Sequence, residues 1–247
     1  MVSEQIMISG TNANLAAEIH YPGDNDLATT LIISHGFRGS KEGGGRAVQL
    51  AQRVAALGYT VIRYDFTPLG SLTKQVAELA QVVNFSRANL SRRIILLGRS
   101  MGGSASLVYA SINDGISGVC LWATPSDLEE TFRLSLGEDY DRLLRNDFLV
   151  VKDGDSELTL AKDFIQDFAN YNLEQCMDSL NNLPVLIIHG DADEIVPFHQ
   201  AEKLFNSAGH DKELVVINGG DHQLAACHQA AEDRVLGWLT KLSLVAD

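Results

Sequence analysis

The sequence predicts an α/β fold in which helices cover both faces of a largely parallel sheet. Short apolar runs that suit buried strands recur along the chain. From residue 30 onward each run is followed by a stretch with apolar residues at helical spacing, a pattern that favours parallel pairing. The first two runs are instead joined by Gly10-Thr11-Asn12, which suits an antiparallel start. These observations predict a mixed sheet with an antiparallel beginning.

The individual elements follow from the same patterns. Gly58 follows the first predicted helix directly, at the position where a glycine with left-handed backbone conformation commonly ends a helix. Eight strands are expected at residues 5–8, 15–21, 30–34, 60–64, 93–97, 118–122, 185–189 and 214–217, and five helices at 46–57, 72–83, 101–112, 200–207 and 224–242.

One region breaks the alternation. About 60 residues separate the strand that ends at Trp122 from the strand that begins at Val185, several times what a crossover requires. Within them, residues 148–160 predict a hairpin that turns at Asp153-Gly154, and residues 161–172 predict a helix. We therefore expect a single domain over residues 1–247, with a small cap inserted at about 126–182 above the C-terminal edge of the sheet.

Composition indicates which kinds of partner and which cellular compartment suit the chain. A net charge of -13 over 247 residues argues against a nucleic-acid partner and should repel strongly anionic substrates at long range. The three scattered cysteines, Cys120, Cys176 and Cys227, suit a reducing compartment. No signal peptide or membrane-spanning run is evident, so a cytoplasmic location is expected. The oligomeric state stays open, a homodimer included.

The segment GRSMGG at 98–103 predicts a nucleophile. It is a G-x-S-x-G motif with an apolar strand in front and a helix behind, a setting in which a sharp turn exposes the serine hydroxyl. Gly98 and Gly102 flank the turn because side chains there would collide with neighbouring backbone. Ser100 is therefore the candidate catalytic nucleophile.

A serine hydroxyl needs a base, and the base needs an orienting carboxylate. Among seven histidines, His222 lies in a loop after the last strand, from which it can reach the serine. The loop HGDADEIVP at 189–197 offers Asp191, Asp193 and Glu194, of which Asp193 is the candidate acid. Asp191 is expected to accept N–H groups of its own loop. A metal site is disfavoured because no histidine pair or calcium-loop spacing accompanies these carboxylates.

Two backbone N–H groups are candidates for an oxyanion hole. One belongs to Met101, the residue after the nucleophile, and the other to Phe37 in the glycine-rich loop 34–45. The order Ser100, Asp193, His222 is the order that a G-x-S-x-G hydrolase triad takes along its chain.

These motifs carry a resemblance to a known family. HGF at 35–37, YDF at 64–66, GRSMGG, HGDADEIVP and GGDH at 219–222 stand in the order and on the elements of an α/β-hydrolase. The chain resembles that superfamily over almost its whole length, and within it the small bacterial carboxylesterases of the cinnamoyl/feruloyl esterase type. The resemblance implies the α/β-hydrolase fold with a mostly parallel eight-stranded sheet, and a serine esterase that needs no cofactor.

The chain departs from those relatives at three places. Arg99 stands where they often have His, Met101 where feruloyl-type enzymes commonly have Gln, and the segment after Asp65-Phe66 is shorter. Arg99 is expected to pair with a carboxylate or to attract an acidic group of the substrate.

The expected reaction is hydrolysis of a small-molecule carboxylic ester through an acyl-enzyme. A thioesterase, a serine aminopeptidase or a monoacylglycerol lipase would use the same triad, and a non-catalytic binding module is the remaining alternative. An aminopeptidase would need an acidic group for the substrate's amino terminus, which the cap's carboxylates could supply. Cap aromatics could wall an acyl pocket or form the cap's own core: Phe132, Phe148, Phe164, Phe168 and Tyr171.

Overall fold

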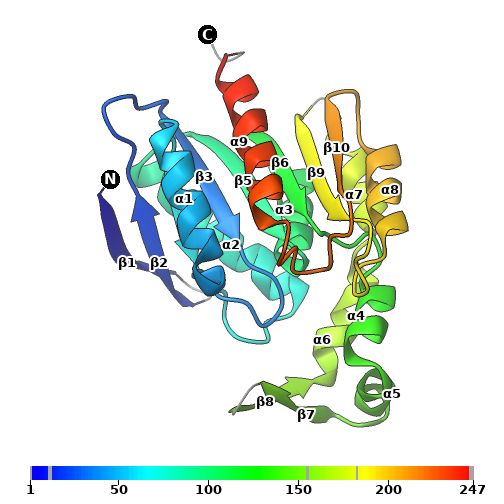
Figure 1. Ribbon diagram of the computed structural model, residues 1–247. Coiled ribbons are helices and arrows are strands. Elements are labelled where there is room, and N and C mark those ends of the chain that lie inside the picture. Colours follow the sequence, from blue (N-terminus) through cyan, green and yellow to red (C-terminus); the bar gives the residue numbers. More distant parts are fainter. Residues whose placement is uncertain (1, 11–12, 154–155, 182, 245–247) are drawn as a thin grey trace.

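A computed structural model describes residues 2–10, 13–153, 156–181 and 183–244. Within these residues an eight-stranded sheet has the order β1-β2-β4-β3-β5-β6-β9-β10 (Figure 1). β2 pairs antiparallel with β1 and β4, and all other pairs are parallel. The strands are β1 (Ser3–Ser9), β2 (Asn14–His20), β3 (Thr29–Ser34), β4 (Thr60–Tyr64), β5 (Arg93–Arg99), β6 (Ile116–Trp122), β9 (Val185–Gly190) and β10 (Lys212–Ile217).

The sheet confirms the expected fold class. Seven of the eight predicted runs lie wholly within a strand, the run 15–21 extends one residue past the end of β2 at His20, and the first pair is antiparallel. Of the expected turn between them, Thr11 and Asn12 lie outside the described residues.

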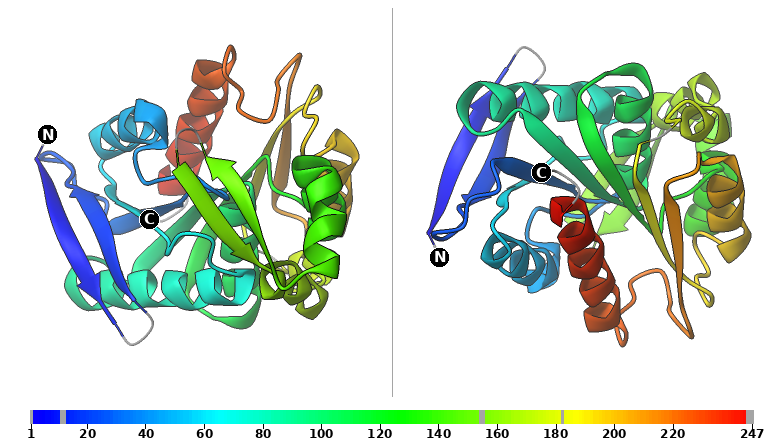
Figure 2. Two further views of the ribbon diagram at one scale, coloured as in Figure 1. Left: turned by 90° about the horizontal axis from the view of Figure 1, so that it is seen from below. Right: turned by 90° about the horizontal axis from the view of Figure 1, so that it is seen from above.

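Helices cover both faces of the sheet (Figure 2). Alternate residues of β3 face opposite sides of the sheet. Leu31 and Ile33 belong to the core that also contains α1 (Arg46–Ala56) and α9 (His228–Leu244). Ile32 belongs to the other core, with α2 (Leu72–Asn89), α3 (Met101–Ile112) and α8 (Phe198–Ser207). This alternation is what period-two side-chain geometry requires of a strand buried on both faces.

The helix boundaries depart from prediction by more than two residues in two places. α2 runs six residues beyond the expected end at residue 83. α9 begins at His228 rather than at Leu224, because residues 221–227 form successive turns in which Leu224 N–H bonds to Asp221 O and Cys227 N–H to Leu224 O. At the end of α1, Gly58 has φ +104° and its N–H bonds to Ala55 O, as expected of a helix-ending glycine.

The segment between β6 and β9 contains more structure than the sequence pattern indicates. Its elements are α4 (Leu128–Leu136), α5 (Glu138–Arg145), β7 (Phe148–Asp153), β8 (Ser156–Ala161), α6 (Lys162–Gln166), the 3₁₀ helix η2 (Asp167–Asn170) and α7 (Leu173–Asp178). β7 and β8 pair as the expected hairpin, which projects with α5 away from the sheet (Figure 1). The expected turn glycine, Gly154, and the expected end of the insertion, residue 182, lie outside the described residues.

The continuous helix predicted at 161–172 is wrong, because the segment divides into two shorter helical elements. The α-helical part ends at Gln166, and η2 continues to Asn170. Phe164, Ile165 and Phe168 are nevertheless buried as their spacing predicts, whereas Ala169, at the same spacing, is exposed. Across the described residues, no helix has the length and apolar character to cross a membrane.

Candidate active site

Ser100 lies at the sharp turn between β5 and α3. It has φ 51° and ψ -126°, a backbone conformation that costs energy for a residue with a side chain. Its N–H donates to Trp122 O at 2.9 Å, which anchors the turn to β6. The sharp turn that the motif predicts is therefore present, with the serine at its tip.

Steric overlap explains why glycine occupies both positions that flank the turn, Gly98 and Gly102. A Cβ on Gly98 would overlap the carbonyl group of Gly102, and a Cβ on Gly102 would overlap the carbonyl oxygens of Ser34 and His35. The backbones of β3, β5 and α3 thus approach each other too closely for any side chain. This close approach places the loop after β3 directly beside Ser100.

Asp193 and His222 form a hydrogen-bonded pair. Asp193 follows β9, and its Oδ2 lies 2.9 Å from His222 Nδ1. Its Oδ1 accepts the N–H groups of Ile195 at 2.9 Å and Val196 at 2.8 Å. Both carboxylate oxygens therefore have fixed partners, and the imidazole is held with Nδ1 facing the acid.

The environment keeps Asp193 ionised. Burial alone would raise the pKa of this carboxyl, because its side chain is fully buried. Contacts with His189 and His222 and the Val196 N–H outweigh burial and hold the pKa well below its ordinary value. A permanent negative charge at this point favours an imidazolium at His222 whenever that ring takes up a proton.

A second contact joins the acid loop to the histidine loop. Asp191 Oδ1 accepts the N–H of Gly219 at 2.6 Å. Asp191 was expected to accept N–H groups of its own loop, and this expectation is corrected, because the carboxylate accepts from the segment that carries His222. The bond fixes the two loops relative to each other, and with them Asp193 and His222.

Ser100 and His222 line one cavity of about 720 Å³. β6 alone separates β5 from β9 in the sheet, so the serine and aspartate strands are about 10 Å apart. His222, on the loop after β10, is hydrogen-bonded to Asp193 and lines the same cavity as Ser100. The structure thus brings the three predicted triad positions to one edge of the sheet.

The loop after β3, which carries the candidate donor Phe37, lies against Ser100. A Cβ on Gly36 would come within 3.0 Å of Ser100 Cβ, so this loop touches the nucleophile. His35 shapes it: Nδ1 donates to Gly36 O at 2.8 Å, and Nε2 accepts the Phe66 N–H at 3.0 Å. Burial lowers the pKa of His35, which suits a ring that must stay neutral to accept that bond.

Met101, the second candidate donor, is the first residue of α3, where an N–H has no acceptor within the helix.

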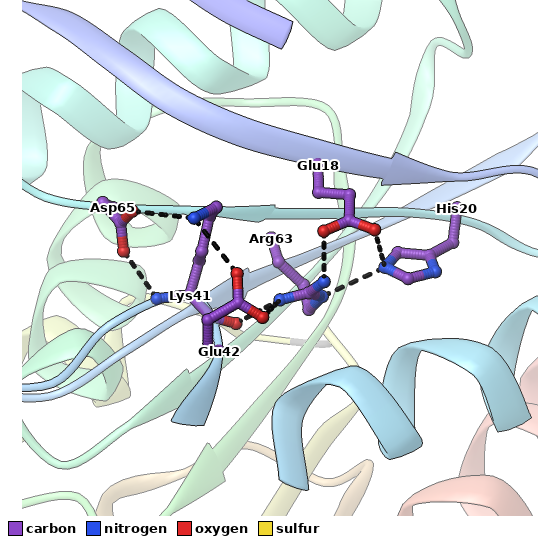
Figure 3. A network of polar contacts seen from close by, with 6 residues as sticks. All are labelled: Glu18, His20, Lys41, Glu42, Arg63 and Asp65. Carbon is purple, nitrogen blue, oxygen red and sulfur yellow. Dashed lines mark hydrogen bonds and ion pairs between the residues drawn. The ribbon is translucent and has the colours of Figure 1, made fainter. Parts of the chain in front are cut away.

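A buried ion-pair network anchors the same loop from beneath (Figure 3). Arg63 on β4 is fully buried and donates to Glu18 at 2.8 Å, His20 at 3.1 Å and the Lys41 carbonyl at 2.5 Å. The Lys41 N–H in turn bonds to Asp65 at 2.6 Å. The loop that carries Phe37 is therefore tied to the antiparallel strands.

Only one of the five cap aromatics lines the cavity. Phe132 does so, in edge contact with Phe37 at a ring separation of 5.1 Å. Phe164 and Phe168 are buried against Phe132 and form the cap's own core. The other two point elsewhere: Phe148 is 60% exposed on the hairpin, and Tyr171 contacts Thr73 through its hydroxyl at 2.6 Å. For these four residues the expectation that they wall the pocket is corrected.

Arg99 bonds to the histidine loop rather than to a carboxylate. Its Nη2 donates to His222 O at 2.9 Å and to Gln223 Oε1 at 2.8 Å. The sequence analysis missed Arg46, Trp122 and His228, which also line the cavity. Only Arg46 has a local signal, since it follows the three glycines of the loop after β3.

This strand order, with a serine elbow after β5, an acid after β9 and a histidine after β10, is the α/β-hydrolase fold. A family model described as serine aminopeptidase, S33, matches residues 138–226. Est1E from Butyrivibrio proteoclasticus superposes with a TM-score of 0.79 and 24% identity, over 96% of this chain and 99% of that one. The esterase domain of a Rhodothermus marinus protein gives 0.77 and 22%, over 96% and 98%. The predicted resemblance to α/β-hydrolases is confirmed.

A curated relative agrees in sequence. The uncharacterized protein YfhR of Escherichia coli K12 is 26% identical in an alignment 218 residues long that covers 81% of this chain. The match spans 65% of the length of YfhR. A structure of Est1E with ferulic acid bound also superposes, with a TM-score of 0.80 and 23% identity over 95% of this chain and 99% of that one.

Proposed function

We propose that the protein is a serine hydrolase that cleaves carboxylic esters through an acyl-enzyme. The hydrogen bond between Asp193 and His222, in a cavity shared with the Ser100 elbow, is the observation that carries the proposal. No other part of the described chain combines an exposed serine turn with a histidine whose orientation a buried carboxylate fixes.

In the proposed reaction, Ser100 Oγ attacks the ester carbonyl while His222 Nε2 accepts the hydroxyl proton. The carbonyl oxygen becomes an oxyanion, which the N–H groups of Phe37 and Met101 stabilise by about 3 to 4 kcal/mol per donor. The intermediate collapses, the ester C–O bond breaks, and the imidazolium protonates the departing alcohol. Water then repeats the sequence on the acyl-enzyme, releasing the acid and restoring Ser100. The proposed steps need no cofactor.

An ester substrate is favoured over an amino-terminal peptide. An aminopeptidase would need a free carboxylate in the cavity, and the described lining contains none. The four cap carboxylates that could serve this role have partners outside the cavity. Glu129 and Asp141 pair with Arg133, Asp139 pairs with Arg142, and Glu130 contacts His199. The apolar contact between Phe37 and Phe132 at the cavity supports an apolar acyl group, in keeping with a feruloyl-type substrate.

Replacing the nucleophile tests the proposal. Ser100→Ala should abolish hydrolysis of 4-nitrophenyl butyrate and labelling by a fluorophosphonate, because both need an activated serine hydroxyl. Ser104→Ala on the same helix is a matched control, since this buried serine is outside the cavity lining. Undiminished turnover by Ser100→Ala, with the fold verified by circular dichroism, would contradict the mechanism. Relative rates on aminoacyl amides, thioesters, monoacylglycerols and methyl ferulate then identify the scissile bond.

A further inference from the structure

The cavity has the opposite charge to the rest of the protein. The chain carries a net charge of -13, yet the described residues that line the cavity include no Asp or Glu. Four cationic side chains line it: Arg38, Lys41, Arg46 and Arg99. An acidic protein that gathers cations around its candidate nucleophile has concentrated positive potential where the substrate would bind.

These cations differ in how their charges are balanced. Lys41 has two carboxylate partners, Glu42 at 3.1 Å and Asp65 at 3.2 Å. Arg46 and Arg99 have neutral partners instead: Arg46 donates to Gln223 O at 2.9 Å, and Arg99 to His222 O and Gln223 Oε1. Over the described residues, neither guanidinium forms an ion pair with a carboxylate. Among the described residues, the hydrogen-bond acceptors of both guanidinium groups are therefore neutral oxygens.

The two guanidinium groups also disfavour each other. Burial lowers the pKa of Arg99, and the charge of Arg46 lowers it further. Asp193 and Asp221 act on Arg99 in the opposite direction, but Asp193 is already bonded to His222. Both arginines bond to the same short segment, residues 222–223, so they converge on one wall of the cavity. Partly desolvated like charges in this arrangement are stabilised by an anion that reaches both.

We propose that Arg46 and Arg99 form a recognition site for a carboxylate carried by the ester substrate. The inference rests on the proposed function, which it narrows from esters in general to esters that bear a negative charge away from the scissile bond. Guanidinium groups suit this role because their planar donors match the geometry of a carboxylate. A carboxylate is favoured over a phosphate monoester, since the net charge of -13 repels a group of nearly two negative charges more strongly.

The wild-type protein provides the first test. The mono-4-nitrophenyl ester of glutaric acid and 4-nitrophenyl valerate have five-carbon acyl groups and the same leaving group, and differ in the terminal carboxylate. A second pair, 4-acetoxybenzoate and 4-acetoxybenzamide, places the charge on the leaving group. With each rate divided by that of hydroxide hydrolysis, we expect kcat/KM for the charged member of one pair to exceed its neutral partner by roughly tenfold or more.

Variants then assign the preference to the arginine pair. Arg46→Gln should lower the ratio of charged to neutral kcat/KM by about tenfold, chiefly through KM for the charged ester, and Arg46→Lys should restore part of it. Arg53→Gln is the matched control, because Arg53 lies on the same helix but pairs with Glu232 and Asp233 of α9. Its ratio should equal that of the wild type.

The outcomes separate the two proposals. If no ester of either pair is hydrolysed, the proposed function fails. If the neutral esters are hydrolysed but neither charged ester is preferred, the arginine pair is no carboxylate site while the hydrolase proposal stands. A loss in Arg46→Gln that is equal for charged and neutral esters would mean that the arginine only positions the 222–223 segment, and it would overturn the inference.

Discussion

Ser100 has a backbone conformation that a serine adopts only under constraint. Its φ of 51° is maintained by the hydrogen bond to Trp122 O and by the close approach around Gly98 and Gly102. The sequence predicted this position because its determinants are neighbours in the chain. Arg99 is the opposite case: its partner His222 lies 123 residues away, and no local pattern shows which carbonyl a guanidinium will meet.

Asp193→Asn tests the role of the buried acid. We expect kcat to fall by about 10⁴-fold at pH 7, because an amide does not stabilise an imidazolium and can reverse the ring's tautomer. Activity on 4-nitrophenyl butyrate measures this, and Asp141→Asn, at an exposed carboxylate of the insertion, is the comparison. A loss below about tenfold would mean that Asp193 does not orient the base.

The same residue makes stability depend on pH. Its pKa is lowered on folding from the ordinary value of 3.8, so the ionised form contributes stability above that pH and loses it as the pH falls. The free energy of unfolding of the wild type should therefore drop more steeply below about pH 4 than that of Asp193→Asn. Urea unfolding of both proteins between pH 7 and pH 3 measures the difference. Parallel curves would contradict the assigned shift.

Among the secondary-structure elements, the strands of the sheet could be predicted from the sequence, whereas the insertion between β6 and β9 could be predicted only in part. Strands buried on both faces show continuous apolar runs, and the long helices have enough turns for their spacing to be visible. α5, α6 and α7 have eight, five and six residues, too few to be stable alone, so packing decides whether they form. For the same reason residues 161–170 could divide between α and 3₁₀ geometry without a sequence signal.

The anchor beneath the glycine-rich loop gives a prediction about stability. Arg63→Met should cost about 3 to 5 kcal/mol of unfolding free energy, because it leaves the Glu18 carboxylate half-buried without its partner. Arg142→Met, which removes exposed pairs with Glu138 and Asp139, should cost less than about 1 kcal/mol. Chemical denaturation compares them. Equal losses would show that the buried network adds nothing beyond a surface pair.

In the whole molecule, two parts of the chain line the cavity. The sheet and its loops carry the candidate triad, and the insertion contributes Phe132. The hairpin β7–β8 is the outermost part of that insertion (Figure 1). Phe148 is 60% and Val150 49% exposed, whereas Leu160 is fully buried. Phe148 and Val150, at least, therefore contribute little to the core that holds the sheet together.

Removing the hairpin tests this division. Replacing residues 148–159 with a four-residue Gly-Ser linker keeps Leu160 and should lower Tm by only a few degrees, because little apolar area is lost from the core. Thermal unfolding by circular dichroism measures the change. Fluorophosphonate labelling of Ser100 shows whether the site persists. A chain that no longer folds would mean that the insertion and the sheet form one inseparable core.

The arginine beneath the glycine-rich loop has a consequence for where the chain can be shortened. The first two strands contribute no residue to the lining of the cavity, and they appear dispensable if only that lining is considered. Glu18 and His20, however, lie on the second strand and contact Arg63. A protein trimmed to begin after His20 would retain every group that lines the cavity, but it would lose Glu18, the nearer of the two carboxylates that pair with Arg63 beneath the glycine-rich loop. The dispensable length at the amino terminus is therefore set by a buried charge and not by distance from the serine.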